Sequence, residues 1–224
     1  MIAALSDTGS IDIHFGTGGY LQLEGVVQDI AVGRKPGEQD ISRLIVSHTH
    51  SDFCRLSAFD LEGRIEESFA QDGSYTLSPL RELAFLRSLA FTPSDEIVAV
   101  GFFNVRVGLI VKLDGFGNPG FADGTAVIEV LPSGTGCELR SVSVGLDHLI
   151  VVAGVSHGGA AGTFAVQGRF TPTGVADEHF GDGGWVVSSQ QGSVLDAFQQ
   201  GGKLVVAGSF REPERAGMIG RFLL

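Results

Sequence analysis

The sequence predicts an all-β protein in a single domain over residues 1–224, built from four copies of one structural unit. Three observations support this prediction: a glycine and phenylalanine pattern that occurs four times, short β-branched runs at the same period, and a composition rich in glycine. The 224 residues include 33 glycines, and 43% of the chain is hydrophobic while only 18% is charged. Short buried strands joined by tight turns are typical of this composition.

The repeated pattern is a glycine, then an acidic or amide residue three positions on, then a phenylalanine six positions on. Its copies are spaced 54, 52 and 59 residues apart and begin at Gly9, Gly63, Gly115 and Gly174. Glycine permits a turn with positive φ, and the polar side chain can bond to free backbone N–H groups in that turn. The phenylalanine is a large apolar anchor of the kind that fills the gap between packed units. These anchors are Phe15, Phe69, Phe121 and Phe180.

Each repeat also contains signals for four strands. Short apolar runs recur at spacings of 54, 53 and 54 residues and end at Ser47, Gly101, Gly154 and Gly208. Another short run precedes each of the last three, with turn residues between the two runs, which predicts a β-hairpin. One further strand follows each glycine turn, and one leads into the next copy of the pattern. Residues 78–91 differ, because their apolar positions follow helical spacing and predict a short helical turn.

Four strands in every fifty-odd residues are typical of the blade of a β-propeller, so we predict a propeller of four four-stranded blades. The repeats extend approximately over residues 9–62, 63–114, 115–173 and 174–224. The run GVADEHFGDGGW from Gly174, with KLVVAG from Lys203, resembles the delta-60 repeat, a bacterial propeller-forming family. The resemblance covers nearly the whole chain, although the third copy departs from it at Asn118 and Pro119. It implies a propeller and no particular chemistry, because propellers host unrelated functions.

The strand that leads into a glycine pattern occurs five times, counting residues 3–5 and 218–223. A ring of four units needs four such strands, so one is in surplus. We expect it to cap the seam of the ring or to pair with a second protomer, since an unpaired edge invites association. A homodimer, in which each chain forms half of a larger ring, is the alternative to a closed ring of four blades.

Composition limits the possible partners and compartments. Fifteen basic against 26 acidic residues give a net charge of −11, which argues against nucleic acid and anionic membranes as partners. Two cysteines are too few for a disulfide scaffold. The N-terminal residues have neither the basic segment nor the apolar run of a signal peptide, so we expect a cytoplasmic protein or one secreted without a classical signal. No residue pattern indicates a cofactor.

We expect a non-enzymatic binding or scaffold module whose partner is another protein. Loops that vary on a rigid scaffold are where function usually resides, and three loops differ between the repeats. These loops are residues 34–40, 47–52 and 155–162. Their candidate binding residues are Arg34, Lys35, Glu38, His48, His50, Asp52, Ser156 and His157.

The alternative is a hydrolase, and one candidate site for it is a metal site. His48, His50 and Asp52 resemble part of the H-x-H-x-D-H zinc motif of metallo-β-lactamase-type hydrolases. Residues i and i+2 of an extended segment share a face, so the two histidines could bind one metal. However, Phe53 stands where that motif has its final histidine.

A second candidate site for a hydrolase is a catalytic serine. Residues 154–158 fit G-x-S-x-G, the nucleophile elbow of α/β-hydrolases, with Ser156 as the nucleophile and His157 beside it. Asp177 and His179 follow in the order of a triad. The elbow needs a helix after its turn, and the glycine-rich residues that follow are poor helix formers. Asp177 and His179 are also repeat positions, which favours a structural role for them.

Overall fold

The computed structural model describes the chain except for residues 51–52, 78–83, 105–106, 122–126, 130, 132–134, 159–161, 212–214 and 224. Within the described residues every regular element is a strand, and neighbouring strands pair antiparallel, which confirms the all-β prediction. The helical turn predicted over residues 78–91 is not found there, since Ala84–Phe91 form strand β7. Residues 78–83 lie outside the described part. No helix in the described residues has the length and apolar character needed to cross a bilayer.

The strands in chain order are β1 (Ile2–Ala3), β2 (Tyr20–Leu21), β3 (Val26–Gly33), β4 (Arg43–His50), β5 (Phe53–Asp60), β6 (Ser74–Thr76), β7 (Ala84–Phe91), β8 (Ile97–Phe103), β9 (Val107–Leu113), β10 (Val127–Glu129), β11 (Gly136–Val144), β12 (Ile150–His157), β13 (Thr163–Phe170), β14 (Trp185–Gln200), β15 (Lys203–Arg211) and β16 (Arg215–Leu223). The three predicted hairpins are confirmed as β7–β8, β11–β12 and β14–β15.

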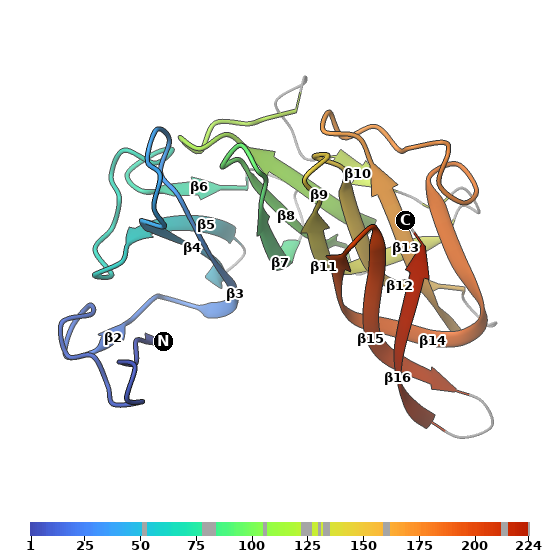
Figure 1. Cartoon of the computed structure of the whole chain (residues 1–224), viewed down its shortest axis with the longest axis horizontal. Helices are drawn as coiled ribbons and strands as arrows, with labels where there is room; N and C mark the ends of the chain where they lie inside the picture. Colours follow the sequence, from blue (N-terminus) through green and yellow to red (C-terminus); the bar gives the residue numbers. More distant parts are fainter. Residues whose placement is uncertain are drawn as a thin grey trace.

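Four successive units follow a short N-terminal hairpin of β1 and β2. The first unit is β3-β4-β5-β6 and the second is β7-β8-β9-β10. Strand β14 pairs with β13 through its first half and with β15 through its second half, so it belongs to two units. The third unit is therefore β11, β12, β13 and the start of β14, and the fourth unit is the end of β14 with β15 and β16. Figure 1 shows the units arranged in an arc from the blue N-terminal end to the red C-terminal end.

The units are offset by one strand from the repeats in the sequence. The glycine turn of the second copy folds the chain back, because Gly63 N–H donates to the carbonyl of Asp60 and Glu66 N–H to that of Ala58. Strand β6, which follows this turn, consequently pairs with β5, which precedes it. The repeat pattern predicts that the strand after each turn belongs to the next unit, whereas in the structure it belongs to the preceding one.

The third copy of the pattern begins at Gly117 rather than at Gly115. Its φ is +84°, and those of Gly9, Gly63 and Gly174 are between +79° and +83°. The four phenylalanine anchors are buried as expected. Three of their rings pack against the glycine of the following copy: a Cβ placed on Gly63, Gly117 or Gly174 would lie 3.1, 3.0 or 2.6 Å from the ring of Phe15, Phe69 or Phe121. Glycine is thus required there both for its φ and for the room that it leaves.

The inner strands of the units are joined by one hydrogen bond that recurs. Each inner strand contains a β-bulge at the equivalent position. The side chain at the bulge accepts an N–H from the next inner strand in three cases: Asp29 from Leu89 at 2.7 Å, Ser88 from Val142 at 3.2 Å and Ser141 from Ala197 at 2.9 Å. Asp196 occupies this position in the fourth unit. The bulges therefore orient polar side chains so that they join neighbouring units.

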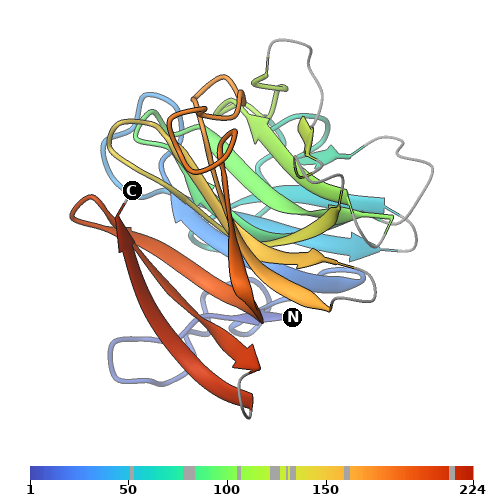
Figure 2. The same ribbon diagram turned by 90° about the vertical axis from the view of Figure 1, so that its right-hand side faces the viewer.

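The arc is not closed by strand pairing in the part of the chain that the structure describes. Strand β3 packs on β7, β7 on β11 and β11 on β14. At one end, Phe15 and Leu21 of the N-terminal segment pack on Leu44 and Val46 of the first unit. At the other end, β16 is the last strand of its sheet. The structure shows an all-β arrangement of antiparallel sheets and does not confirm a closed ring of four blades (Figures 1 and 2).

The bulge position of the first unit gives a testable dependence of stability on pH. Burial raises the pKa of Asp29 above its ordinary value of 3.8, and the nearby carboxylate of Asp196 adds to this, while the N–H groups of Leu89 and Ile30 oppose it. Because the folded pKa is raised, the stabilisation from this group is complete below pH 3.8 and is lost as the pH rises through the raised value. Asparagine keeps an oxygen for the Leu89 N–H and carries no charge. We expect Asp29→Asn to stabilise the protein at neutral pH by less than about 1 kcal/mol, since the carboxylate is partly hydrated.

Urea unfolding midpoints of the wild type and Asp29→Asn, measured at neutral pH and again below the ordinary pKa of aspartate, would check this expectation. The gain should vanish at the acidic pH. A difference of the same size at both values would contradict the assignment.

Candidate functional site

Two of the three variable loops are not loops over their full predicted length. Residues 47–50 are the end of strand β4, and Asp52 lies outside the described residues. Residues 155–157 are the end of strand β12, and residues 159–161 are also outside the described part. In these two places a strand of the sheet includes the first residues of the segment that was expected to be a loop.

The segment at residues 34–40 does connect two strands, β3 and β4, and its charged residues hold it in place. Arg34 Nε donates to Asp95 Oδ1 at 2.8 Å, and Lys35 Nζ lies 3.9 Å from Glu66 Oε2. The N–H of Glu38 donates to the carbonyl of Lys35 within the turn. Arg34 therefore joins the first unit to the hairpin turn of the second.

The predicted serine triad is not assembled. Ser156 is buried in β12, and its hydroxyl donates to the carbonyl of Phe164 at 3.4 Å. His157 Nε2 lies 3.1 Å from Glu138 Oε1. Asp177 accepts from Arg169 Nε at 2.8 Å and from the N–H of His179 at 3.0 Å, and the pKa of Asp177 is lowered by these bonds. Asp177 and His179 thus serve the glycine turn.

His48 has partners at both ring nitrogens, which does not suit a metal ligand. Nδ1 lies 3.2 Å from the carbonyl oxygen of Glu24, and Nε2 lies 2.9 Å from Ser57 Oγ. Nδ1 of His50 lies 3.3 Å from the Glu24 carboxylate, outside hydrogen-bond geometry. No group of three or more metal-ligating side chains occurs among the described residues.

The environment of His48 keeps its ring neutral. Burial lowers the pKa of His48 below its ordinary value of 6.5, and the charges of Arg55 and His50 act in the same direction, against the Glu24 carbonyl. A proton on Nδ1 satisfies that carbonyl, so Nε2 is left as a hydrogen-bond acceptor. A neutral imidazole with a free lone pair on Nε2 is the form that can act as a general base.

A chain of hydroxyl groups extends from His48 across the sheet. Ser57 Oγ lies 2.9 Å from His48 Nε2 and 2.8 Å from Ser74 Oγ. The strand register produces this alignment, since Ser57 is directly opposite Ser74 and His48 is directly opposite Arg55. These side chains therefore share one face of the first unit, and the register of three neighbouring strands fixes their order.

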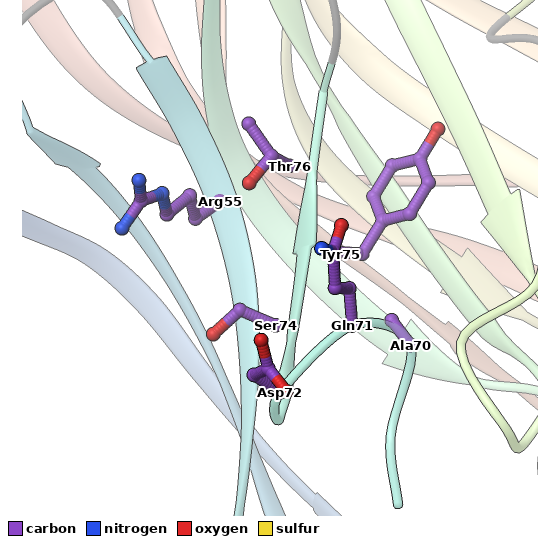
Figure 3. Close-up of a pocket in the computed structure, with 7 residues that line it drawn as sticks. All are labelled: Arg55, Ala70, Gln71, Asp72, Ser74, Tyr75 and Thr76. Carbon is purple, nitrogen blue, oxygen red and sulfur yellow. The ribbon is translucent and has the colours of Figure 1, made fainter. Parts of the chain in front are cut away.

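Ser74, the last residue of this series of hydrogen-bonded side chains, lines a cavity at the outer edge of the unit. The cavity has a volume of about 630 Å³, and its walls are Arg55, Ala70, Gln71, Asp72, Ser74, Tyr75 and Thr76. Figure 3 shows Arg55, Ser74 and Thr76 on one side of strand β6 and Tyr75 on the other. Nε of Arg55 is buried, and among the described residues it has no hydrogen-bond partner. The guanidinium of Arg55 places a positive charge at the wall of the cavity that Ser74 also lines.

The polar residues of this site stand where other units have glycine or apolar residues. His48 is opposite Val27, just before the bulge, as Gly101 is opposite Leu86 in the second unit. The register likewise makes Arg55 equivalent to Leu109 and Ser57 equivalent to Val111, both of which are buried in the apolar core. The sequence analysis aligned Ser47 with the repeated glycine, one residue too early. It therefore did not single out Arg55, Ser57 or Ser74, which an alignment through the bulge would have found.

Comparisons with known proteins give limited information. No protein-family model matches the chain, and no curated protein matches its sequence. A solved structure of an exo-1,5-alpha-L-arabinanase from a bovine ruminal metagenomic library is similar over 80% of this chain and 68% of the other, with 12% identity and a TM-score of 0.39. A likeness at this level does not transfer a substrate or a reaction.

The expectation of a non-enzymatic binding or scaffold module is corrected at this point. One of the solved structures that the chain matches is that of an enzyme, and we withdraw the expectation. The loops on which it relied are also partly strand. The hydrolase alternative remains; Ser156 donates to a backbone carbonyl rather than to a base, both ring nitrogens of His48 have partners, and Asp52 lies outside the described residues.

Proposed function

We propose that the protein is a hydrolase in which Ser74 is the nucleophile and His48, acting through Ser57, is the base. The observation that carries this proposal is the unbroken chain of hydrogen bonds from His48 Nε2 through Ser57 Oγ to Ser74 Oγ, at 2.9 and 2.8 Å. Both distances suit proton transfer between a nucleophile and its base. The substrate is a small ester or a related acyl compound that fits the cavity beside Ser74.

The reaction has two steps, acylation of Ser74 and hydrolysis of the acyl-serine. Ser74 Oγ attacks the carbonyl carbon while its proton passes to Ser57 and the proton of Ser57 passes to His48 Nε2. The imidazolium returns a proton through Ser57 to the departing alcohol, and the acyl group stays on Ser74. Water then attacks the acyl-serine with the same base, which releases the acid and restores Ser74. Each step needs His48 to be neutral at its start.

Arg55 supplies the positive charge that the transition state requires. Its guanidinium lines the same cavity as Ser74, and its positive charge suits the negative oxygen that develops on the attacked carbonyl. Its charge also lowers the pKa of His48, so that the base stays unprotonated at neutral pH. The same guanidinium would thus assist both the base and the tetrahedral intermediate.

We also propose that the four units are blades of an incomplete β-propeller and that the chain is related to the delta-60 repeat proteins. The recurring glycine turn, the buried phenylalanine and the repeated bond between inner strands support this proposal. The site would then lie at the outer edge of the first blade. A cytoplasmic location, or secretion without a classical signal, remains a prediction.

The pH dependence of ester turnover tests the role of His48. We expect turnover of a chromogenic acetate ester, corrected for the reaction without protein, to be constant near neutral pH. It should fall only below pH 6.5, because protonated His48 cannot accept a proton and its pKa is lowered. His50→Ala is the matched control, since His50 lies two residues away on the same strand and does not bond to Ser57.

The control should retain turnover and the acidic limb, with only a small shift of that limb because the charge of His50 is removed. Absence of turnover in the folded wild type would overturn the proposal. Turnover without an acidic limb, or turnover that needs added metal ions, would also exclude His48 as the base.

A further inference from the structure

The fourth unit exposes apolar residues whose equivalents are buried in the second unit. Ile219 is opposite Ala207, just as Ile110 is opposite Val100. Ile110 is 0% exposed because it packs against the third unit, whereas Ile219 is 83% exposed. Phe198, on the inner strand, is also 50% exposed. The fourth unit thus has the residues of an inter-unit interface on a face that the described chain does not cover.

The edge of this unit is uncovered as well. Strands β5, β9 and β13 each pair with a fourth strand on their outer side. Strand β16 is nine residues long and is the last of its sheet in the described part of the chain. Figure 2 shows this red sheet at the margin of the molecule. A long open edge next to exposed apolar side chains favours association with another polypeptide.

The distribution of charge indicates which polypeptide would bind to this edge. Residues 192–223, which make up the fourth unit, carry a small positive net charge, with four basic residues against three acidic ones: Lys203, Arg211, Arg215 and Arg221 against Asp196, Glu212 and Glu214. The first 33 residues contain neither lysine nor arginine, and their acidic residues are Asp7, Asp12 and Glu24, together with Asp29, whose carboxylate accepts from β7 within the molecule. This N-terminal surface also exposes apolar side chains, among them Leu5, Ile13 and Val26. Two fourth units facing each other would lack this complementarity of charge.

We propose that the fourth unit of one molecule binds the acidic N-terminal surface, residues 1–33, of a second copy of this chain. The contact is head-to-tail, because the two surfaces are at opposite ends of the arc. It joins the apolar face around Ile219 to the exposed apolar residues of the N-terminal segment, with Arg221 and Glu24 among the charges that set the orientation. If two molecules each use both surfaces on the other, the result is a closed dimer. If the two surfaces of one molecule bind different molecules, longer assemblies form.

Light scattering over a range of protein concentrations, with a monomer mass of 23.5 kDa as the reference, tests this proposal. We expect the wild type to associate and Ile219→Asp to raise the apparent dissociation constant at least about tenfold. An unchanged circular dichroism spectrum would confirm that the variant folds. Leu146→Asp is the matched control, since Leu146 is 93% exposed in a hairpin turn away from this face, and it should associate like the wild type.

A charge exchange identifies the partner surface. Arg221→Glu and Glu24→Lys should each weaken association when measured alone, and a mixture of the two should recover part of it. A wild type that is monomeric at every concentration would overturn the proposal. So would a dimer that Glu24→Lys leaves unchanged, because it would show pairing through β16 on both molecules.

Discussion

Replacement of Ser74 by alanine should lower kcat for ester hydrolysis by about a thousandfold or more, as the loss of a nucleophile does in serine hydrolases. The reason is chemical, because alanine cannot form the acyl intermediate and the path of the proton from Ser57 to the substrate is interrupted. KM should change little, since Arg55 and the other walls of the cavity remain in place. Stopped-flow or steady-state turnover of the same chromogenic ester gives both constants.

Ser156→Ala is the matched comparison, because it removes the hydroxyl that the G-x-S-x-G pattern singled out. Ser156 lies in β12 and its hydroxyl donates to the carbonyl of Phe164 in β13, so its loss should leave turnover within about twofold once folding is confirmed. The opposite result, with turnover lost in Ser156→Ala and kept in Ser74→Ala, would refute the proposed nucleophile. Labelling of Ser74 by an acylating or phosphonylating reagent would give independent evidence.

The recurring turns could be predicted from the sequence because their causes are local. A glycine with positive φ is needed wherever the chain reverses, and a phenylalanine is needed wherever two units meet, so both recur visibly. The turn glycine of the third copy is Gly117, only four residues before Phe121, so the six-residue spacing selects Gly115 instead, and the observed φ and turn hydrogen bond are needed to identify Gly117. The offset between repeat and unit could not be predicted, since strand periodicity does not say which neighbour a strand will pair with.

Only part of the candidate site could be predicted from the sequence. His48 was singled out for its resemblance to a metal motif, and its position is important for a different reason, which is its bond to Ser57. Ser57 and Ser74 are 17 residues apart and have no marked spacing. Their contact depends on the register of β5 against β6, and the repeats are easily misaligned by one residue here because His48 stands where the other units have a glycine.

Replacement of Phe69 by alanine should cost about 3–5 kcal/mol of unfolding free energy, as expected when a large buried aromatic side chain leaves a cavity. The ring is fully buried in the cluster between the first and second units and lies against Gly117. It also lies under the buried guanidinium of Arg43, 5.5 Å from the ring centroid, and Arg43 is held by Glu66. Loss of the ring therefore removes apolar packing and a cation–π contact together. Urea unfolding followed by circular dichroism would measure the change.

Phe116→Ala is the matched control for Phe69→Ala, because Phe116 is 58% exposed in the same glycine turn and its carbonyl still accepts the N–H of Ala70. It should change the unfolding free energy by no more than about 0.5 kcal/mol. If the anchors act as the repeat indicates, the loss at Phe69 should also separate the first and second units, which meet at that ring. Hydrogen exchange should then show the largest loss of protection in β4, β5 and β8. Equal costs for the two variants would mean that the phenylalanine of the pattern is not the anchor between units.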